Sequence, residues 1–124
     1  MIAGIGSDIV ETERVAEKIA KNQGFREYTF SAAEIAYCES NKYKSEHYAG
    51  RFAAKEALLK AFGIGILGEL ILHEIEVINE ASGKPTFNFL GATASFIQAQ
   101  NITAIHLTLS HIKSVAIAFV VVEK

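Results

Sequence analysis

The spacing of hydrophobic and polar residues changes several times along the first half of the chain, and each change predicts a new element. Residues 2–10, IAGIGSDIV, form an apolar run with glycines that predicts a strand. A helix is predicted next over residues 12–23, with Thr12 as its N-cap. The stretch SAAEIAYCES follows, and the capping-box spacing of Ser31 and Glu34 predicts a second short helix.

A long helix is predicted over residues 45–62, and Gly63 suits the left-handed position that closes a helix. At about 100° per residue, the stretch RFAAKEALLK leaves no broad face for solvent. Four charged side chains nevertheless remain on it: Arg51, Lys55, Glu56 and Lys60. Glu56 and Lys60 have the i, i+4 spacing of a surface ion pair. The alternative is that a mostly buried helix keeps its charges because a charged ligand docks there.

The second half of the chain predicts strands and one further helix. Residues 73–80 and 86–90 alternate between apolar and polar positions around the turn SGKP, as in a hairpin. Residues 92–101 predict a helix, and residues 104–112 and 115–123 predict two strands joined by a tight turn. Because helices and strands cluster along the chain instead of alternating strictly, we expect an α+β fold.

Composition limits the classes of protein that fit. A chain of 124 residues, half of them apolar, is expected to form a single domain over residues 1–124 with a real core. The net charge of −2 argues against a general nucleic-acid binder. No apolar run reaches the ~18 residues of a membrane span, and MIAGIGSDIV lacks the pattern of a signal peptide. We expect a cytoplasmic protein in which Cys38, the lone cysteine, is a structural thiol.

Two carboxylates stand out as candidate metal ligands. Asp8 follows GIGS at the far end of the first predicted strand, where it is either an ordinary acid at a helix start or a functional group. Glu56 lies in a poorly solvated helix, where a carboxylate needs a partner. If the two converge, their oxygens suit Mg²⁺, which takes one or two protein carboxylates together with water and phosphate oxygens. Lys60, Lys55 and Arg51 on the same helix would then neutralise the phosphates.

Other polar motifs carry weaker signals. The glycines of GIG, residues 63–65, either stop the helix or let the backbone approach a pyrophosphate, but their spacing matches no P-loop or dinucleotide fingerprint. Lys84, in the turn SGKP, either only completes the turn or touches a ligand phosphate. Ser110 and His111 are neighbours on a strand and face opposite ways, so they cannot form a nucleophile–base pair. His111 is either a donor to phosphate or a histidine satisfied within the sheet.

A basic stripe runs along the first predicted helix of this slightly acidic protein. Arg14, Lys18 and Lys21 lie at i, i+4 and i+7, and Arg26 lies just beyond the helix. Such a stripe is most often a solvated face. The alternative is a docking surface for an acidic partner, with Phe25 as an exposed apolar anchor.

Four groups of segments together resemble one known family. GIGSDIV, GRFAAKEALLKAFGIG, IEV with SGKP, and LTLSH with AIAFVVVE, in this order and in a chain of this length, resemble the holo-acyl-carrier-protein synthases. The resemblance covers nearly the whole chain, and RFAAKEALLKAFGIG is its most specific part. It implies a 4′-phosphopantetheinyl transferase-like fold, in which an antiparallel sheet packs with one long central helix and shorter helices.

The resemblance also implies an activity. Such an enzyme moves 4′-phosphopantetheine from coenzyme A to a serine of acyl carrier protein for fatty acid biosynthesis and releases adenosine 3′,5′-bisphosphate. Magnesium would be held by Asp8 and Glu56, and Lys60 would face the pyrophosphate. The general base stays open between a water held by the metal and Glu56. The carrier would dock on the basic stripe, with Arg14 as its strongest contact, and the family implies a homotrimer with each site between neighbouring subunits.

The nucleotide contacts are likewise implied by the resemblance. Arg51 and His111, with Lys42, would contact the ribose 3′-phosphate. The residues expected around coenzyme A are Lys42, Arg51, Lys60, Gly63, Gly65, Lys84, Pro85, Ser110 and His111. Where the family pattern is SxSHT, this chain keeps a hydroxyl at Thr108 and loses one at Ile112. Two other classes stay open: a non-catalytic coenzyme A or nucleotide-binding module, and a metal-dependent hydrolase of nucleotide diphosphates.

Overall fold

The structure, a computed structural model, describes residues 1–63 and 68–124. Its elements follow in the order β1 (Ile2–Glu11), α1 (Thr12–Ala20), α2 (Phe25–Thr29), α3 (Ala32–Glu39), α4 (Lys44–Phe62), η1 (Leu72–Glu74), β2 (Ile75–Asn79), β3 (Pro85–Phe89), α5 (Gly91–Ala99), β4 (Ala104–His111) and β5 (Val115–Glu123). The α+β class is confirmed. None of the helices in these two ranges has the length and apolar character needed to cross a membrane.

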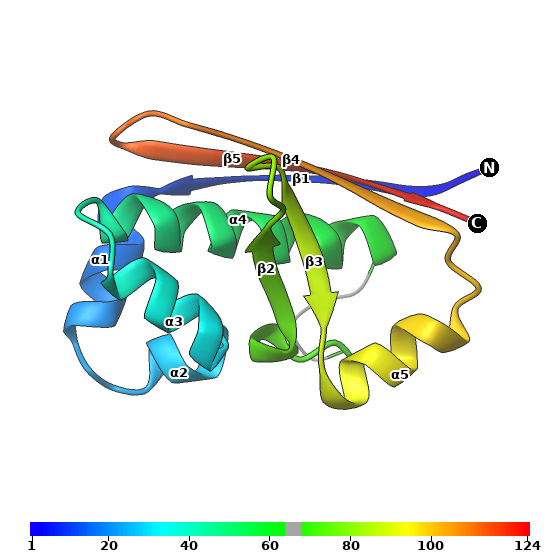
Figure 1. The fold of residues 1–124 in the computed structure, drawn as a ribbon, viewed down its shortest axis with the longest axis horizontal. Coiled ribbons are helices and arrows are strands. Elements are labelled where there is room, and N and C mark those ends of the chain that lie inside the picture. Colours follow the sequence, from blue (N-terminus) through cyan, green and yellow to red (C-terminus); the bar gives the residue numbers. More distant parts are fainter. Residues whose placement is uncertain (64–67) are drawn as a thin grey trace.

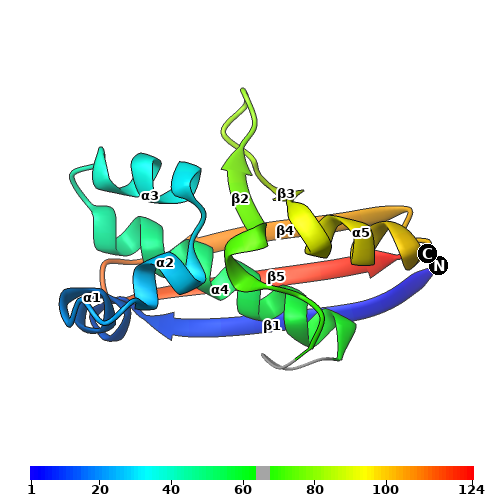
Figure 2. The ribbon, with the colours of Figure 1, turned by 90° about the horizontal axis from the view of Figure 1, so that it is seen from below.

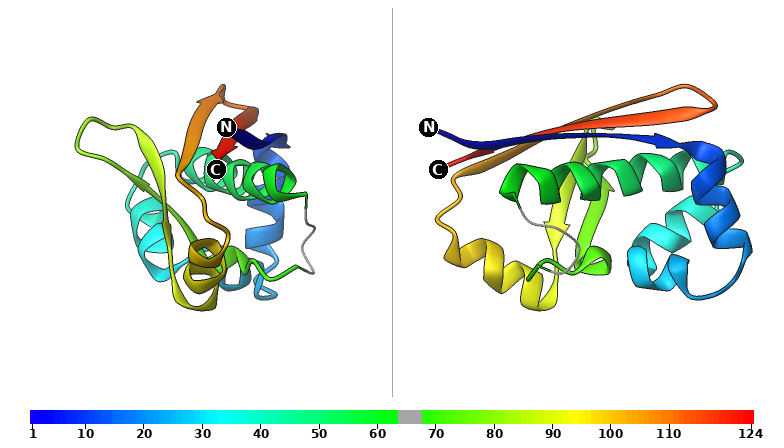
Figure 3. Two further views of the ribbon diagram at one scale, coloured as in Figure 1. Left: turned by 90° about the vertical axis from the view of Figure 1, so that its right-hand side faces the viewer. Right: turned by 180° about the vertical axis from the view of Figure 1, so that it is seen from behind.

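The elements stack on the two sides of α4, which runs through the middle of the molecule (Figure 1). One side is an antiparallel sheet in the order β1-β5-β4, and α4 lies along it (Figure 3). On the other side lie α1, α2 and α3, then the β2–β3 hairpin and α5 (Figure 2). The expected sheet with one long central helix is therefore present.

Glycines let α4 approach β1 closely. A Cβ built on Gly6 would lie 2.0 Å from the carbonyl oxygen of Ala57, and one on Gly4 would lie 2.0 Å from that of Ala61. No side chain fits at either position, so these glycines bring the backbones of strand and helix together. Ten of the nineteen residues of α4 are buried, as the lack of a solvent-facing side predicted.

The helix ends agree with the sequence in part. The capping box of Ser31 and Glu34 is present, and Gly63 closes α4 in the left-handed region with φ of 72°. The first helix, predicted over residues 12–23, ends at Ala20. The prediction of Thr12 as N-cap is wrong, because Glu11 holds that position and makes no side-chain cap. The short helix α2 was not predicted.

The strands match their predicted positions closely. β2 and β3 form the expected antiparallel hairpin, and β4 and β5 are joined by the expected tight turn. β1 continues to Glu11, so Asp8 lies within the strand and is not an acid at a helix start. The face of the sheet away from α4 exposes four large apolar side chains: Ile5, Ile9, Ile117 and Phe119.

Candidate active site

Asp8 and Glu56 meet in one cleft of about 400 Å³ between β1, α1 and α4. Asp8 points to the helix side of the sheet because it lies two residues from each of Gly6 and Val10, which are buried on that side. Glu56 comes from the fourth turn of α4. The remaining lining residues are Ile9, Val10, Glu11, Arg14, Val15, Lys18, Phe52 and Val115. The predicted convergence of the two carboxylates therefore occurs within a single chain.

The cleft is electrostatically suited to a cation. Burial raises the pKa of Glu56, and the negative charge of Asp8 raises it further, while Lys60 and Lys18 act in the opposite direction. Two carboxylates that share a desolvated cleft repel each other, and a cation between them removes that repulsion. A lysine meets part of this need.

Lys60 is that lysine, and its partner is Asp8. Lys60 Nζ lies 3.0 Å from Asp8 Oδ1. The alternative of a surface pair between Glu56 and Lys60 is not observed. The Asp8 side chain is 16 % exposed, whereas that of Lys60 is 57 % exposed.

The donor set fits a magnesium ion that is shared with a ligand. Among residues 1–63 and 68–124, no cluster of three or more histidine, cysteine, aspartate or glutamate side chains could hold a metal alone. Mg²⁺ does not need such a cage, since it commonly binds one or two carboxylates and takes its other oxygens from water and phosphate. Asp8 and Glu56 supply that number of carboxylates.

The basic stripe of α1 adjoins this cleft. Arg14 and Lys18 line it, and Lys18 and Lys21 line a neighbouring hollow together with Tyr28. Phe25 also lines this hollow, but the prediction that it is exposed is wrong, because its ring is half-buried against Phe30 and Phe52. The exposed aromatic in this hollow is Tyr28, at 59 %.

Arg26 is already paired with acids. Its Nε lies 2.9 Å from Glu27 Oε1 and its Nη1 lies 3.4 Å from Glu39 Oε2. The net positive charge that it adds to the stripe is therefore small.

Two basic residues of α4 lie inside the protein. Lys55 is fully buried and bound to Glu34, so the expectation that it neutralises phosphates is wrong. Arg51 is 5 % exposed, and its guanidinium carbon lies 4.4 Å from the ring centre of Tyr37. Its Nε is buried without a hydrogen-bond partner in the described part of the chain.

Several residues expected around coenzyme A lie away from the Asp8–Glu56 cleft. Lys42 lines a second cleft, of about 760 Å³, near the start of α4 and the β4–β5 turn. His111 Nδ1 lies 3.4 Å from Glu46 Oε1, and Glu46 is about 15 Å along the helix axis from Glu56. Ser110 is exposed and alternates with His111, so the two face opposite ways as predicted.

The remaining residues expected around coenzyme A lie in the β2–β3 hairpin and at the end of α4. Lys84 is exposed in the β2–β3 turn, and Pro85 begins β3; neither lines the two clefts described above. Gly63 ends α4, and Gly65 lies outside the described residues. Phe52 is a lining residue that the sequence reasoning missed, although its i−4 spacing from Glu56 puts the two on one face of the helix.

Comparisons with known proteins agree with one another. A family model described as the 4′-phosphopantetheinyl transferase superfamily matches residues 4–120. A holo-[acyl-carrier-protein] synthase of Cytophaga hutchinsonii is 46 % identical, over 100 % of this chain and 99 % of that protein.

Solved structures show the same relationship. The crystal structure of holo-[acyl-carrier-protein] synthase from Neisseria meningitidis matches with a TM-score of 0.92 at 35 % identity, covering 100 % of both chains. A holo-(acyl-carrier-protein) synthase from Bacillus anthracis in complex with CoA (3′,5′-ADP) matches with a TM-score of 0.79 at 37 % identity, over 98 % of this chain and 96 % of that one.

Proposed function

The chain belongs to the 4′-phosphopantetheinyl transferase superfamily, and from this premise we infer that it is a holo-acyl-carrier-protein synthase. It transfers 4′-phosphopantetheine from coenzyme A to a serine hydroxyl of acyl carrier protein and releases adenosine 3′,5′-bisphosphate. The serine oxygen forms a bond to phosphorus, the bond to the leaving nucleotide phosphate breaks, and the serine gives up its proton. The observation that carries the assignment is the cleft in which Asp8 and Glu56 converge beside Arg14 and Lys18.

The residues of the cleft divide the work between charge and position. Asp8 and Glu56 would hold a magnesium ion, which would supply positive charge to offset that of the phosphates. Lys60, which now pairs with Asp8, offsets negative charge on the leaving phosphate. Catalysis of phosphoryl transfer rests mainly on such positioning and electrostatics. The nucleophile belongs to the carrier, and Ser110 accordingly need not be activated. Water is the first candidate to accept the serine proton and Glu56 the second, because a cation held by Glu56 would lower the pKa of its carboxylate.

Coenzyme A is proposed to extend from this cleft toward the residues that the family pattern assigns to the nucleotide. These residues are Lys42, Arg51, Gly63, Gly65, Lys84, Pro85, Ser110 and His111. His111, at the end of β4, lies beside Glu46 of α4, far from Glu56 of its own chain. We therefore expect it to bind coenzyme A in a site shared with a neighbouring subunit.

A homotrimer would supply that neighbour. The outer face of the sheet exposes Ile5, Ile9, Ile117 and Phe119, and the paired strands place Ile9 opposite Ile117. A contiguous apolar patch of this kind on a small protein is typical of an interaction surface. Contact between sheets of neighbouring copies would cover these side chains.

A single assay tests the function against its alternatives. We expect the protein, mixed with coenzyme A, magnesium and apo-acyl carrier protein, to increase the mass of the carrier by one phosphopantetheine, as read by mass spectrometry. A reaction without carrier is the control. Loss of coenzyme A in that control would indicate a hydrolase, and bound coenzyme A with an unchanged carrier would indicate a binding module.

Replacing Arg14 by alanine is expected to weaken use of the carrier. Arg14 lines the edge of the cleft on exposed α1, where an acidic partner would be recognised mainly through charge. We expect KM for the carrier to rise about 5- to 10-fold with little change in KM for coenzyme A. Arg14→Lys keeps the charge and should retain most of the affinity. Equal losses for the carrier and for coenzyme A in Arg14→Ala would contradict a docking role.

A further inference from the structure

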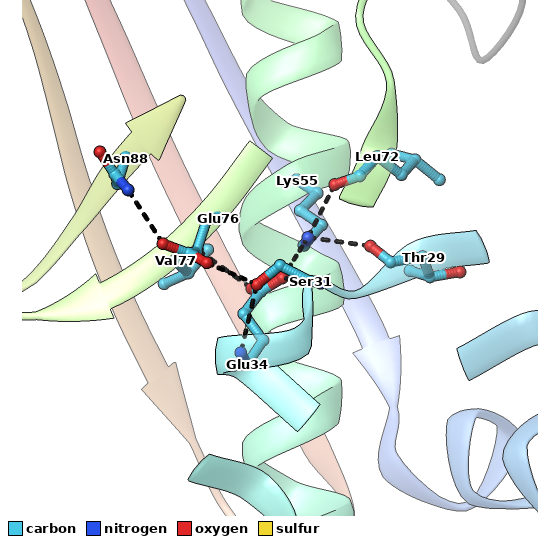
Figure 4. Close-up of polar contacts among 8 residues, drawn as sticks. All are labelled: Thr29, Ser31, Glu34, Lys55, Leu72, Glu76, Val77 and Asn88. Carbon is cyan, nitrogen blue, oxygen red and sulfur yellow. Dashed lines mark hydrogen bonds and ion pairs between the residues drawn. The ribbon is translucent and has the colours of Figure 1, made fainter. Parts of the chain in front are cut away.

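A buried polar network joins α4 to the layer of helices and strands beneath it (Figure 4). Lys55 Nζ donates to Glu34 Oε1 at 2.6 Å, to the carbonyl of Thr29 at 2.9 Å and to the carbonyl of Leu72 at 2.8 Å. Glu34 also accepts from the backbone amides of Ser31 at 2.9 Å and Val77 at 3.0 Å. Both ionic side chains are completely buried.

This pair satisfies backbone hydrogen-bonding groups of three other elements, α2, η1 and β2, and of the N-cap of α3. Lys55 uses all three of its N–H donors. Two of them donate to backbone carbonyls, one on the last residue of α2 and one on the first residue of η1. Glu34 completes the N-terminus of α3 through the capping box and holds β2 through Val77. A fully satisfied buried network of this kind is rigid and directional.

The hydrogen bonds that Tyr48 and Lys60 of α4 make to Glu39 and Asp8 are less buried than those of Lys55. Alanine fills four of the buried positions of α4, Ala49, Ala53, Ala54 and Ala57. Small side chains offer shallow ridges, and burial of apolar surface has no preferred direction. A rotation of α4 by about 20° would move a side-chain end by on the order of 2 Å. Misplacement of catalytic groups by about 1 Å can cost on the order of 10² in rate.

We propose that the Lys55–Glu34 pair is a positioning device that sets the rotation of α4 and thereby holds the Glu56 carboxylate opposite Asp8. Lys55 directly precedes Glu56, so an anchor at one fixes the direction of the other. This inference rests on the proposed function, because it assigns the pair to the same active cleft. Neither Lys55 nor Glu34 contacts substrate in this arrangement.

Glu34→Gln tests the proposal with the smallest change of shape. Glutamine keeps an oxygen for Lys55, removes the negative charge, and loses an acceptor for Val77. We expect kcat at saturating coenzyme A, carrier and magnesium to fall about 10-fold, with both KM values within about 2-fold of wild type. If Glu34→Gln does not fold, Lys55→Arg takes its place, because it keeps the charge but cannot match the same three acceptors.

Glu74→Gln is the matched control for lost stability. Glu74, the last residue of η1, also binds the first turn of a helix: its Oε1 accepts from Thr93 N and Oγ1 of α5, both at 3.0 Å. Its side chain has no hydrogen bond to α4. Its variant should lower the melting temperature and leave kcat within about 2-fold. A kcat for Glu34→Gln equal to wild type, or kcat losses that simply follow the melting temperature in both variants, would overturn the proposal.

A structural measurement that does not depend on catalytic activity tests this inference separately from the proposed function. Crystal structures of the wild type and Glu34→Gln should show the Asp8 and Glu56 carboxylates further apart in the variant, by about 1 Å or more. An unchanged separation refutes the positioning role whether or not the wild type transfers phosphopantetheine. Absence of transfer by the wild type refutes the proposed function alone.

Discussion

Glu56→Gln is expected to reduce phosphopantetheine transfer by about 10²- to 10³-fold while leaving the protein as stable as the wild type or more so. Glutamine has nearly the same shape but no charge, so it cannot balance a divalent cation together with Asp8. The stability follows from the pKa of Glu56, which burial and Asp8 raise in the folded state. A carboxylate whose pKa is raised on folding costs stability at pH values above its unfolded pKa, and the neutral amide removes that cost.

The measurement combines a carrier-modification rate with thermal unfolding at neutral pH. Glu69→Gln is a suitable control, since Glu69 is an exposed glutamate outside the Asp8–Glu56 cleft. It should change neither quantity. Transfer by Glu56→Gln at the wild-type rate would exclude this residue from the active site. A large drop in melting temperature would instead assign it a structural role.

Local signals in the sequence were sufficient for the elements that depend on neighbouring residues. The capping box of Ser31 and Glu34 and the closing Gly63 are both short-range patterns, and both are present. The helix α2 depends on distant residues. Its last carbonyl, that of Thr29, is bound by Lys55, and the ring of Phe25 packs on Phe52. A five-residue helix held in this way has little signal of its own.

The same distinction separates the correct and incorrect parts of the predicted site. Asp8 and Glu56 converge as expected, because a carboxylate in a poorly solvated helix implied a partner. The spacing of residues along a helix could not predict which acid each lysine pairs with. Spacing allowed Lys60 to pair with Glu56, but the adjacent strand offers it Asp8. Lys55 faces away from that strand, toward an acid twenty-one positions earlier, and no sequence period reports such a contact.

The close contact of strand and helix leads to the second large effect, on stability. Gly6→Ala would place a methyl group 2.0 Å from the carbonyl oxygen of Ala57. Because the clashing atom belongs to the backbone, no change of side-chain rotamer can relieve the clash. Replacing Ala57 by glycine would not relieve it either. Overpacking of this kind typically costs about 1–3 kcal/mol. We expect the upper end, about 3 kcal/mol, with a fall in melting temperature on the order of 10 °C.

Gly50→Ala distinguishes this clash from a general effect of removing glycine. Gly50 lies within α4, and a Cβ there would meet only Leu109 Cδ1 at an ordinary 3.9 Å. Alanine should therefore stabilise the helix by about 0.5–1 kcal/mol. Equal free energies of unfolding for both variants, from denaturant titration, would mean that β1 and α4 can separate freely.

Gly6 and Asp8 share one face of β1, so a strand pushed from the helix at Gly6 should also draw Asp8 away from Glu56. Transfer should then decline in Gly6→Ala even at temperatures where the variant is fully folded.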